Sequence, residues 1–475
     1  MMRNGESSRL APGRGPAPAT SDPLGESLRS AVRVLHGWLD YQRVLHRVPA
    51  LSVAIVRGDD VILNAAYGHA DVATGRKATD ATGYRIASIT KTFTATAVMQ
   101  LCERGLVRLD ERVERYVPWF RSRRDTPLEA ITVRQLLSHT GGVERDGTDH
   151  WVSDRFPKLE QLKARVQNGV AALAPLERWK YSNLGYAVLG AVVAAAAGQS
   201  YEDYVRAQIL APLGLASTGF AVTPRVVRTL AVGYGRARAG RRRETFPNPD
   251  TNAMRPAAGL ISNATDLSAY VAAQFPGSGR LLSDLNKREM QRAQWVSDGE
   301  PQYGLGYSLW PVAGAVIVGH GGGFQGFKTA IGMDPARKIG VVVLTNAIDG
   351  PAQEWMTGIF HTIDDCATRL GRDRPTRRAP YVRRYEGRFT GRWWDVQLVE
   401  VGGRLLGYDP RGDRPLREVH ELEYRSPGNL RIVSGPGAGH VGEAVTFQPG
   451  PRGVPRALRW GPNLMTRARQ AESPD

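Results

Sequence analysis

The sequence predicts an α+β fold, an α/β-sandwich in which helices flank an antiparallel sheet beside an all-helical region, followed by a small all-β barrel. Three observations predict it. Strand-like segments occur near both ends of the long N-terminal region, helix-like segments occupy its middle, and short alternating segments fill the chain beyond residue 380. With 475 residues, the chain exceeds what a single hydrophobic core usually holds, so two domains are expected.

The N-terminal segment 1–27 is rich in Gly, Pro, Ser and Arg, which predicts a disordered tail. It lacks the apolar stretch of a secretory signal, and no uninterrupted apolar run in the chain approaches the length of a membrane helix. Cys102 and Cys366 are far apart in the sequence, which fits a reducing compartment better than a disulfide framework. We therefore expect a cytoplasmic protein without membrane contact.

The sheet is predicted from two separated segments. Residues 49–68 indicate two strands around a Gly-Asp turn, and residues 314–346 indicate three short strands joined by Gly-rich and "DPARK" turns. Because both segments alternate or are strongly apolar, we expect them to complete one sheet. Helical segments with apolar faces lie between them, at 87–102, 183–198 and 264–275.

The C-terminal region differs in composition from the rest. We expect the first domain to span 28–372 and a linker to span 373–380, where basic residues and Pro are frequent. From 381 to 475, short alternating segments are separated by Gly and Pro turns, which favours a barrel or a sandwich. Closure into a barrel would remove the exposed strand edges.

The formal net charge of +17 raises the possibility of nucleic-acid binding. Only 8 of the 63 basic residues are Lys, and the Arg residues are scattered along the whole chain. The short basic clusters lack the interleaved aromatic residues of a nucleic-acid groove. We expect no nucleic-acid partner, no metal and no cofactor.

The stretch "SITK" places Lys91 three residues after Ser88, near the start of the predicted helix 87–102. A serine hydroxyl is a weak nucleophile until a base removes its proton, and a lysine can be that base only if its pKa is depressed. The helix start adds backbone N–H groups beside the serine. A capping serine beside a lysine that extends to solvent would give the same pattern.

The stretch "YSN" forms a second candidate element before the predicted helix 183–198. In one interpretation, Tyr181 packs as an aromatic residue and Asn183 caps the helix. In the other, Tyr181 exchanges protons between Ser88 and the leaving group, while Asn183 hydrogen-bonds the substrate. The two interpretations are compatible.

Three H-x-G stretches compete for a third element, which must hold the substrate along a strand edge. The His139 stretch ends a helix-like segment, where Gly141 is predicted to be the C-cap, and the His440 stretch lies in the predicted barrel. His320 follows a strand and is continued by glycines, which let a substrate carbonyl approach the backbone closely. We therefore favour His320, with Gly322 and Gly323; a Gly-rich hairpin turn is the structural alternative.

The segments "YRIASITKTFTATAVMQL", "ITVRQLLSHTGG", "YSNLGYAVLG", "AAGLISNATDLSAY" and "GHGGGFQGF" occur in this order. Together they resemble the serine β-lactamase-related hydrolases, which include class C β-lactamases, D-alanyl-D-alanine carboxypeptidases, D-aminopeptidases, esterases and acyltransferases. The resemblance covers roughly residues 28 to 370. It implies the β-lactamase/penicillin-binding-protein-like fold.

The resemblance also implies roles for individual residues. Ser88 would be the nucleophile, Lys91 and Tyr181 the proton-transfer pair, and His320 would occupy the third-motif position. The oxyanion hole would use the backbone N–H groups of Ser88 and Gly323. Typical β-lactamases carry Lys-Thr-Gly where this chain has His-Gly-Gly, which puts recognition of a β-lactam carboxylate in doubt.

Three functions remain open from the sequence. The first is a serine hydrolase for ester or amide bonds, including small or D-configured peptides, with a Ser88 acyl-enzyme. The second is an acyltransferase, or a penicillin-binding-protein-type thioesterase that cyclises or releases a nonribosomal peptide; those enzymes carry a lipocalin-like C-terminal domain and would bring a carrier protein as partner. The third is a non-catalytic, ligand-binding member of the family.

The predicted barrel has two alternative roles. It could act as a lid or wall that narrows the cleft, with Arg467 or Arg469 holding a substrate carboxylate. It could equally provide packing support alone.

Overall fold

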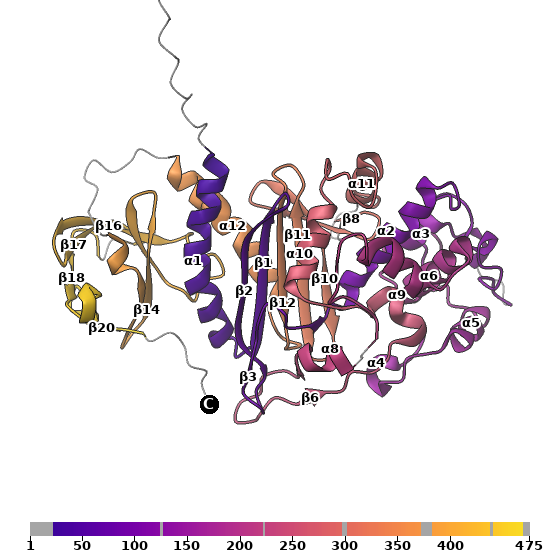
Figure 1. Cartoon of the computed structure of the whole chain (residues 1–475), viewed down its shortest axis with the longest axis horizontal. Helices are drawn as coiled ribbons and strands as arrows, with labels where there is room; N and C mark the ends of the chain where they lie inside the picture. The colour runs from indigo at the N-terminus through magenta and orange to yellow at the C-terminus, as the bar shows by residue number, and fades with distance from the viewer. Residues whose placement is uncertain are drawn as a thin grey trace, which may run out of the picture.

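A computed structural model describes residues 22–123, 127–221, 224–296, 302–371, 382–437 and 440–468. It contains a central antiparallel sheet, a helical region on one side of that sheet and a closed barrel on the other (Figure 1). This arrangement confirms the predicted α+β fold with a C-terminal barrel.

The central sheet has eight strands in the order β3-β2-β1-β12-β11-β10-β9-β8. In chain order, the first and last strands of this sheet are β1 and β12, and they are neighbours in its middle. Their pairing runs from Leu51 opposite Thr345 to Arg57 opposite Ile339. The two predicted strand segments therefore form one sheet, as expected. The strands are β1 (Ala50–Arg57), β2 (Asp60–Asp71), β3 (Arg76–Lys77), β8 (Gln302–Tyr303), β9 (Ser308–Val312), β10 (Ala315–Phe324), β11 (Phe327–Asp334) and β12 (Ile339–Thr345).

Both faces of the central strands are buried, which explains their nearly continuous apolar sequence. On β12, Val341 and Val343 face a core shared with α1 (Pro23–Leu45) and α12 (Ala352–Leu370). Val342 and Leu344 face the opposite core, to which α10 (Ala264–Ala273) contributes. The sheet thus separates two hydrophobic cores.

The helical region is built around two long apolar helices, α2 (Thr90–Glu103) and α6 (Asn183–Ala197), which pack against each other. Gly198 ends α6 in the left-handed conformation, with a φ of 65°. The other helices and turns are η1 (Ala87–Ile89), η2 (Val113–Arg115), η3 (Pro127–Ala130), α3 (Val133–Leu137), α4 (His150–Ser153), α5 (Leu159–Gln167), α7 (Tyr201–Val205), η4 (Arg206–Leu210), α8 (Pro224–Thr229), η5 (Asn252–Met254), α9 (Arg255–Ala258) and α11 (Asp284–Gln291).

Two short strand pairs complete this region. Strand β4 (Tyr84–Arg85) pairs with β7 (Ile261–Ser262), directly before the η1 turn. Strand β5 (Gly233–Tyr234) pairs with β6 (Thr245–Phe246).

The barrel is closed by pairing between its first and last strands, β13 and β20. Its interior is filled by apolar side chains such as Phe389, Leu405 and Trp460. The elements are η6 (Val382–Tyr385), β13 (Gly387–Gly391), β14 (Asp395–Val401), β15 (Arg404–Tyr408), β16 (Val419–Ser426), β17 (Asn429–Ser434), β18 (Ala444–Gln448), η7 (Pro451–Gly453), β19 (Ala457–Trp460) and β20 (Asn463–Arg467).

The barrel docks on α1 and α12, the two helices that cover the sheet face turned away from α2 (Figure 1). The Trp38 indole donates a hydrogen bond to the Gly412 carbonyl oxygen at 2.8 Å, and the Gln42 amide donates to Pro410 O at 2.7 Å. Tyr408 and Leu416 of the barrel domain enter the same core as the two helices. The barrel is therefore anchored by a packed, hydrogen-bonded interface.

The predicted tail needs a correction, and the predicted linker and Arg469 fall outside the described residues. The predicted disordered tail reaches residue 27, but α1 begins at Pro23, because the Asp22 side chain caps it by accepting from Gly25 N at 3.1 Å. The predicted linker 373–380 and Arg469 lie outside the described residues, as do residues 1–21.

Within the described residues, no single helix is long and apolar enough to cross a membrane. A bent pair formed by Asn183–Ala197 and Tyr201–Leu210 reaches the required length and apolarity only together, with an angle of 77° between its parts.

Candidate active site

Ser88 sits in the η1 turn that links β4 to α2. The preceding residue, Ala87, has a positive φ of 50°, which is uncommon for a residue with a side chain. The turn is tied down on both sides, since Ile86 N donates to Leu260 O at 3.1 Å and the Thr329 hydroxyl donates to Ile86 O at the same distance. The predicted helix start is thus confirmed, with Ser88 in the turn just before α2 rather than inside it.

Lys91, on the first turn of α2, is fully buried. Its Nζ lies 3.1 Å from Ser88 Oγ, 2.7 Å from Asn183 Oδ1 and 2.8 Å from the Ala257 carbonyl oxygen. Burial holds the pKa of Lys91 well below its usual value of 10.5; Asp146 opposes this shift and Arg145 adds to it.

The three neighbours of Lys91 determine how a neutral amine would bond there. Asn183 Oδ1 and Ala257 O can only accept, so they use the two N–H groups of the neutral amine. The remaining lone pair then faces Ser88 Oγ and can accept the serine proton. The geometry therefore places the Lys91 amine where it could accept the Ser88 proton.

Tyr181 completes the hydrogen bonds of the nucleophile, because its hydroxyl donates to Ser88 Oγ at 2.7 Å. Burial raises the pKa of Tyr181 above its ordinary value, so the phenol keeps its proton at neutral pH. The Lys91 amine also lies over the Tyr181 ring, 4.8 Å from its centroid. Ser88 Oγ thus lies between the Lys91 amine and the Tyr181 hydroxyl.

Asn183 is oriented toward Lys91 rather than toward an open substrate site. Its Oδ1 accepts from Lys91, and its Nδ2 donates to Asp146 Oδ1 at 2.6 Å. The helix cap is Ser182, whose hydroxyl accepts from Gly185 N at 2.8 Å, so the alternative in which Asn183 caps α6 is wrong. Its predicted contact with substrate stays a prediction.

His320 lies on β10, close to the catalytic cluster but bonded to other groups. Its Nδ1 is 2.6 Å from Gly321 O and therefore donates, which leaves Nε2 to accept from the Tyr303 hydroxyl at 3.0 Å. Burial and the nearby Lys91 lower the pKa of His320 to about 3. The hydrogen bonds place this neutral ring beside Tyr181, at 6.3 Å between centroids, and not on Ser88.

Gly322 allows β10 to lie against the η1 turn. A Cβ atom at this position would be 2.2 Å from Thr329 Oγ1 and 2.4 Å from the Ile86 carbonyl oxygen. Glycine is thus required here by contacts within the protein, whereas the predicted approach of a substrate carbonyl to Gly322 stays a prediction. Gly323, the next residue, is exposed.

One edge of β10 is open beside Ser88. Pairing with β9 ends at Gly319, whereas pairing with β11 continues to Phe324. Within the described strands, residues 320–324 therefore have no strand partner on the edge that faces away from β11. The η1 turn packs against β10 in this part of the strand. An extended acyl group could pair with such an edge.

His139 belongs to the catalytic cluster, contrary to the sequence interpretation. Its ring centroid is 4.4 Å from that of Tyr181, and its Nδ1 accepts from Ser182 N at 3.1 Å. The predicted C-cap at Gly141 is also wrong: α3 is followed by Ser138 as C-cap and by His139 with a φ of 61°. The imidazole contacts explain why His139 adopts this conformation.

A match to a profile of the family described as Beta-lactamase covers residues 39–355. The chain belongs to the beta-lactamase family. The match lies inside the range of roughly 28 to 370 over which the motifs resemble these enzymes.

Individual relatives of the beta-lactamase family extend this result. The chain is 29% identical over 302 residues to Protein flp of Staphylococcus aureus strain N315, covering 63% of this chain and 60% of that protein. It is 27% identical over 299 residues to Penicillin-binding protein 4* of Bacillus subtilis strain 168, covering 58% of this chain and 64% of that protein. In both cases, less than two thirds of the relative's own length is matched.

Solved structures of similar fold include the octameric penicillin-binding protein homologue from Pyrococcus abyssi, with a TM-score of 0.61 and 25% identity over 92% of this chain and 100% of that one. The structure of EstCE1, described as a hydrolase with promiscuous acyltransferase activity, has a TM-score of 0.61 and 23% identity over 72% of this chain and 98% of that one. These likenesses support the penicillin-binding-protein-like fold.

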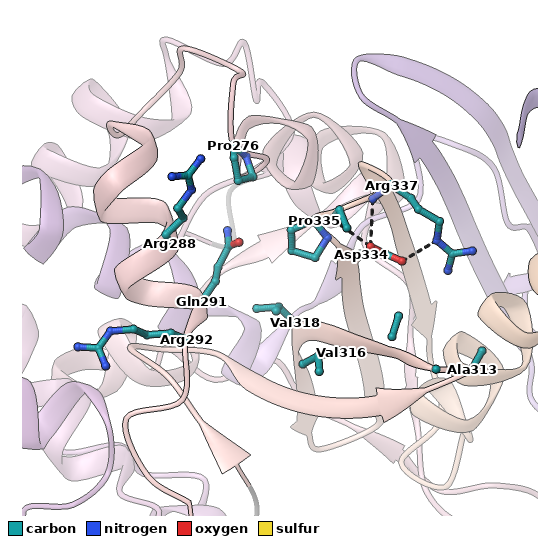
Figure 2. Close-up of a pocket in the computed structure, with 13 residues that line it drawn as sticks. Pro276, Arg288, Gln291, Arg292, Ala313, Val316, Val318, Asp334, Pro335 and Arg337 are labelled. Atoms are coloured by element: carbon teal, nitrogen blue, oxygen red, sulfur yellow. Dashed lines mark hydrogen bonds and ion pairs between the residues drawn. The ribbon is translucent and has the colours of Figure 1, made fainter. Parts of the chain in front are cut away.

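A hollow of about 870 Å³ lies away from the beta-lactamase-family motifs, at the other end of β10 (Figure 2). Val316 and Val318 line it, with Arg288 of α11 on one side and Arg337 after β11 on the other. Arg337 is bonded to Asp334 and Asp364. Since none of the predicted site residues lines this hollow, it is distinct from the candidate active site.

No group of three His, Cys, Asp or Glu side chains in the described part of the chain could hold a metal ion. Arg467, proposed from the sequence as a possible substrate contact, instead donates to the carbonyl oxygens of Glu386 and Pro455. Its guanidinium covers the Phe389 ring of the barrel. Arg467 therefore does not reach into the site, and Arg469, the other residue predicted for this contact, lies outside the described residues.

The sequence does not identify Asp146, Arg145 or Tyr303 as neighbours of the site. Asp146 reaches Asn183, Arg145 lies over the Tyr181 ring with 5.1 Å from Cζ to the ring centroid, and Tyr303 bonds His320. The nearest sequence signal is the "SHTGG" segment shortly before Arg145. The local pattern does not show that this loop folds back onto α6.

Proposed function

We propose that this chain is a serine hydrolase that cleaves ester or amide bonds of small acyl compounds, including small or D-configured peptides, through an acyl-enzyme on Ser88. The observation that supports this most directly is the position of Ser88 Oγ, which lies 3.1 Å from Lys91 Nζ and accepts a hydrogen bond from the Tyr181 hydroxyl at 2.7 Å. A binding protein without chemistry would have no need for a buried lysine with a depressed pKa at this position.

In the proposed acylation, Ser88 Oγ attacks the substrate carbonyl carbon while its proton passes to Lys91 Nζ. The Tyr181 hydroxyl gives its proton to the leaving alcohol or amine, and Lys91 returns a proton to Tyr181. Collapse of the tetrahedral intermediate breaks the bond to the leaving group and forms the Ser88 ester. Water then attacks that ester by the reverse proton path.

The backbone supplies the remaining proposed contacts. The N–H groups of Ser88 and Gly323 would bind the developing oxyanion, as the motif resemblance implies. The open outer edge of β10 would pair with an extended acyl chain. A neutral His320 does not itself supply a positive charge to a substrate carboxylate.

The test is turnover of activated acyl esters by the wild-type protein and by Ser88→Ala. We expect hydrolysis by wild type, a transient mass increase equal to the acyl group, and a loss of at least about 10³-fold in Ser88→Ala. The variant should fold normally, since one hydroxyl contributes little to the core. Equal turnover by the two proteins would refute the proposal.

The same experiment separates the alternatives for the acceptor. If the protein is an acyltransferase, or a thioesterase-like cyclase that would use a carrier protein, addition of amines should give an amide product. A hydrolase should give the free acid. No adduct and no turnover with any ester would leave the non-catalytic, ligand-binding interpretation.

A further inference from the structure

Asp146 lies behind the catalytic cluster, in the loop that precedes α4. Its side chain is 17% exposed and accepts hydrogen bonds from Asn183 Nδ2 at 2.6 Å and from the Trp151 indole at 2.7 Å. Arg145 Nε is 3.4 Å away and His150 Nε2 is 3.8 Å away. This carboxylate is therefore held by two hydrogen-bond donors, with Arg145 and His150 nearby.

The carboxylate determines which way the Asn183 amide points. A carboxylate can only accept, so the Asn183 NH₂ group must face Asp146 and the amide oxygen must face Lys91. The reverse orientation would place an oxygen against a carboxylate and an NH₂ group against the amine. The Asp146 carboxylate thus keeps an acceptor in front of one N–H group of Lys91.

This orientation controls the lone pair of Lys91. With Asn183 Oδ1 and Ala257 O both accepting, the free lone pair is directed at Ser88. If the amide turned, its NH₂ group would compete with the Ser88 hydroxyl for that lone pair. The chain of contacts from Asp146 through Asn183 to Lys91 therefore reaches the nucleophile.

We propose that Asp146 is a positioning residue that orients the Asn183 amide and supplies the negative charge that balances Lys91 when it takes up the Ser88 proton. This inference rests on the proposed acyl-enzyme function. It assigns a role to a residue outside the serine, lysine and tyrosine triad, and Asp146 itself touches neither substrate nor the reacting atoms.

Several charged and titratable groups face Lys91 besides Asp146. Burial and Arg145 lower its pKa, and Asp146 raises it. The rings of Tyr181 and Tyr186 lie 4.8 and 5.4 Å from Nζ, and both remain protonated because burial raises their pKa values. The remaining neighbours are two buried imidazoles, His139 and His320, whose pKa values are lowered by burial and by Lys91 itself.

Removal of the Asp146 charge should change both the rate of acylation and its pH dependence. Asp146 raises the pKa of Lys91. The acylation rate of the Asp146→Asn variant should therefore reach half of its plateau at a lower pH than that of wild type. The new amide at position 146 can also donate a hydrogen bond to Asn183 Oδ1, which would turn the Asn183 amide. Its NH₂ group would then compete for the Lys91 lone pair, so the plateau rate should fall by at least about tenfold.

The experiment measures the rate of Ser88 labelling by a fluorophosphonate, followed by intact mass, from acidic to alkaline pH. Asp149→Asn is the matched control, because it removes the same charge from an exposed position three residues away that does not bond Asn183. We expect Asp149→Asn to retain the wild-type midpoint and plateau. Thermal unfolding verifies that each variant is folded.

Two outcomes would overturn the inference. One is an Asp146→Asn variant with the wild-type rate and midpoint; the other is a loss of rate with an unmoved midpoint, which a merely structural role would give. If wild type is not labelled at Ser88, the proposed function itself fails, and this result is distinct from the other two.

Asp146→Glu keeps the charge and provides the test if Asp146→Asn does not fold. The added methylene should shift the carboxylate relative to Asn183 while keeping the negative charge on the same loop. We expect a reduced plateau rate with a midpoint near that of wild type. A wild-type rate in Asp146→Glu would show that the position of the carboxylate is unimportant and would contradict the inference.

Discussion

The active-site region and the barrel use burial in opposite ways. Around Ser88, the buried side chains include Lys91, Asn183, His139 and His320, and their polar atoms bond mainly to one another or to the backbone. The barrel interior is filled by apolar side chains, Trp460 among them. The comparison teaches that the region around Ser88 buries a connected polar cluster, of the kind found at functional sites, whereas the barrel interior contributes packing.

The interface between the barrel and α1 provides the largest expected effect on stability. Trp38 is fully buried, and its indole bonds Gly412 O across the interface. Trp38→Ala should lower the free energy of unfolding by about 3–5 kcal/mol, the range for large-to-small changes in a core. Urea unfolding measures this loss.

The folded fraction of Trp38→Ala should keep its kcat/KM, because α1 lies across the sheet from α2 (Figure 1), the helix that begins just after Ser88. Arg467→Ala, which changes hydrogen bonds inside the barrel only, should likewise keep kcat/KM. A selective loss of kcat in either folded variant would break the division between the two regions.

The contribution of His320 to the pH dependence of unfolding is a smaller expected effect, and it sharpens the comparison between the two regions. Its pKa is about 3 in the folded protein and 6.5 for an ordinary histidine, so between these values the unfolded state binds one more proton. The free energy of unfolding should therefore fall as the pH drops below about 6.5, by about 1.4 kcal/mol per pH unit for this group.

The His320→Gln variant should lose this contribution, so its unfolding free energy should depend less steeply on pH between about 6.5 and 4. Chemical unfolding at several pH values gives the two slopes. His139, whose pKa is also lowered, is present in both proteins and retains its own contribution. Equal slopes would show that His320 is not held neutral by its surroundings.

Much of the fold and the central triad could be predicted from the sequence because they have local signals. The spacing of Ser88 and Lys91 on one turn, the Gly58 hairpin and the apolar segment of α6 are all visible in short windows. The order of the motifs then identifies which segments meet. The glycine pattern singled out Gly322 for the approach of a substrate, whereas the contacts that require glycine there are with Thr329 and Ile86.

Other parts of the site depend on contacts between distant segments. Asp146 lies in an irregular loop, and its link to Lys91 passes through Asn183 on another element. His139 has the same H-x-G pattern as His320, but its helix-like context hid its contact with Tyr181. The barrel position could not be predicted either, because Trp38 and Gly412 are far apart in the chain.

The central claim is that Lys91 acts as the base that activates Ser88. The most direct measurement compares the rate of fluorophosphonate labelling of wild type and Lys91→Arg from acidic to alkaline pH, with the labelled peptide identified by mass. An arginine stays protonated and cannot accept the serine proton. Because the pKa of Lys91 is depressed, the labelling rate of wild type should rise with pH, reach half of its plateau well below pH 10.5 and then level off. Lys91→Arg should label at least about 10³-fold more slowly. Rapid labelling of Ser88 in Lys91→Arg would contradict the account and would assign the base to Tyr181.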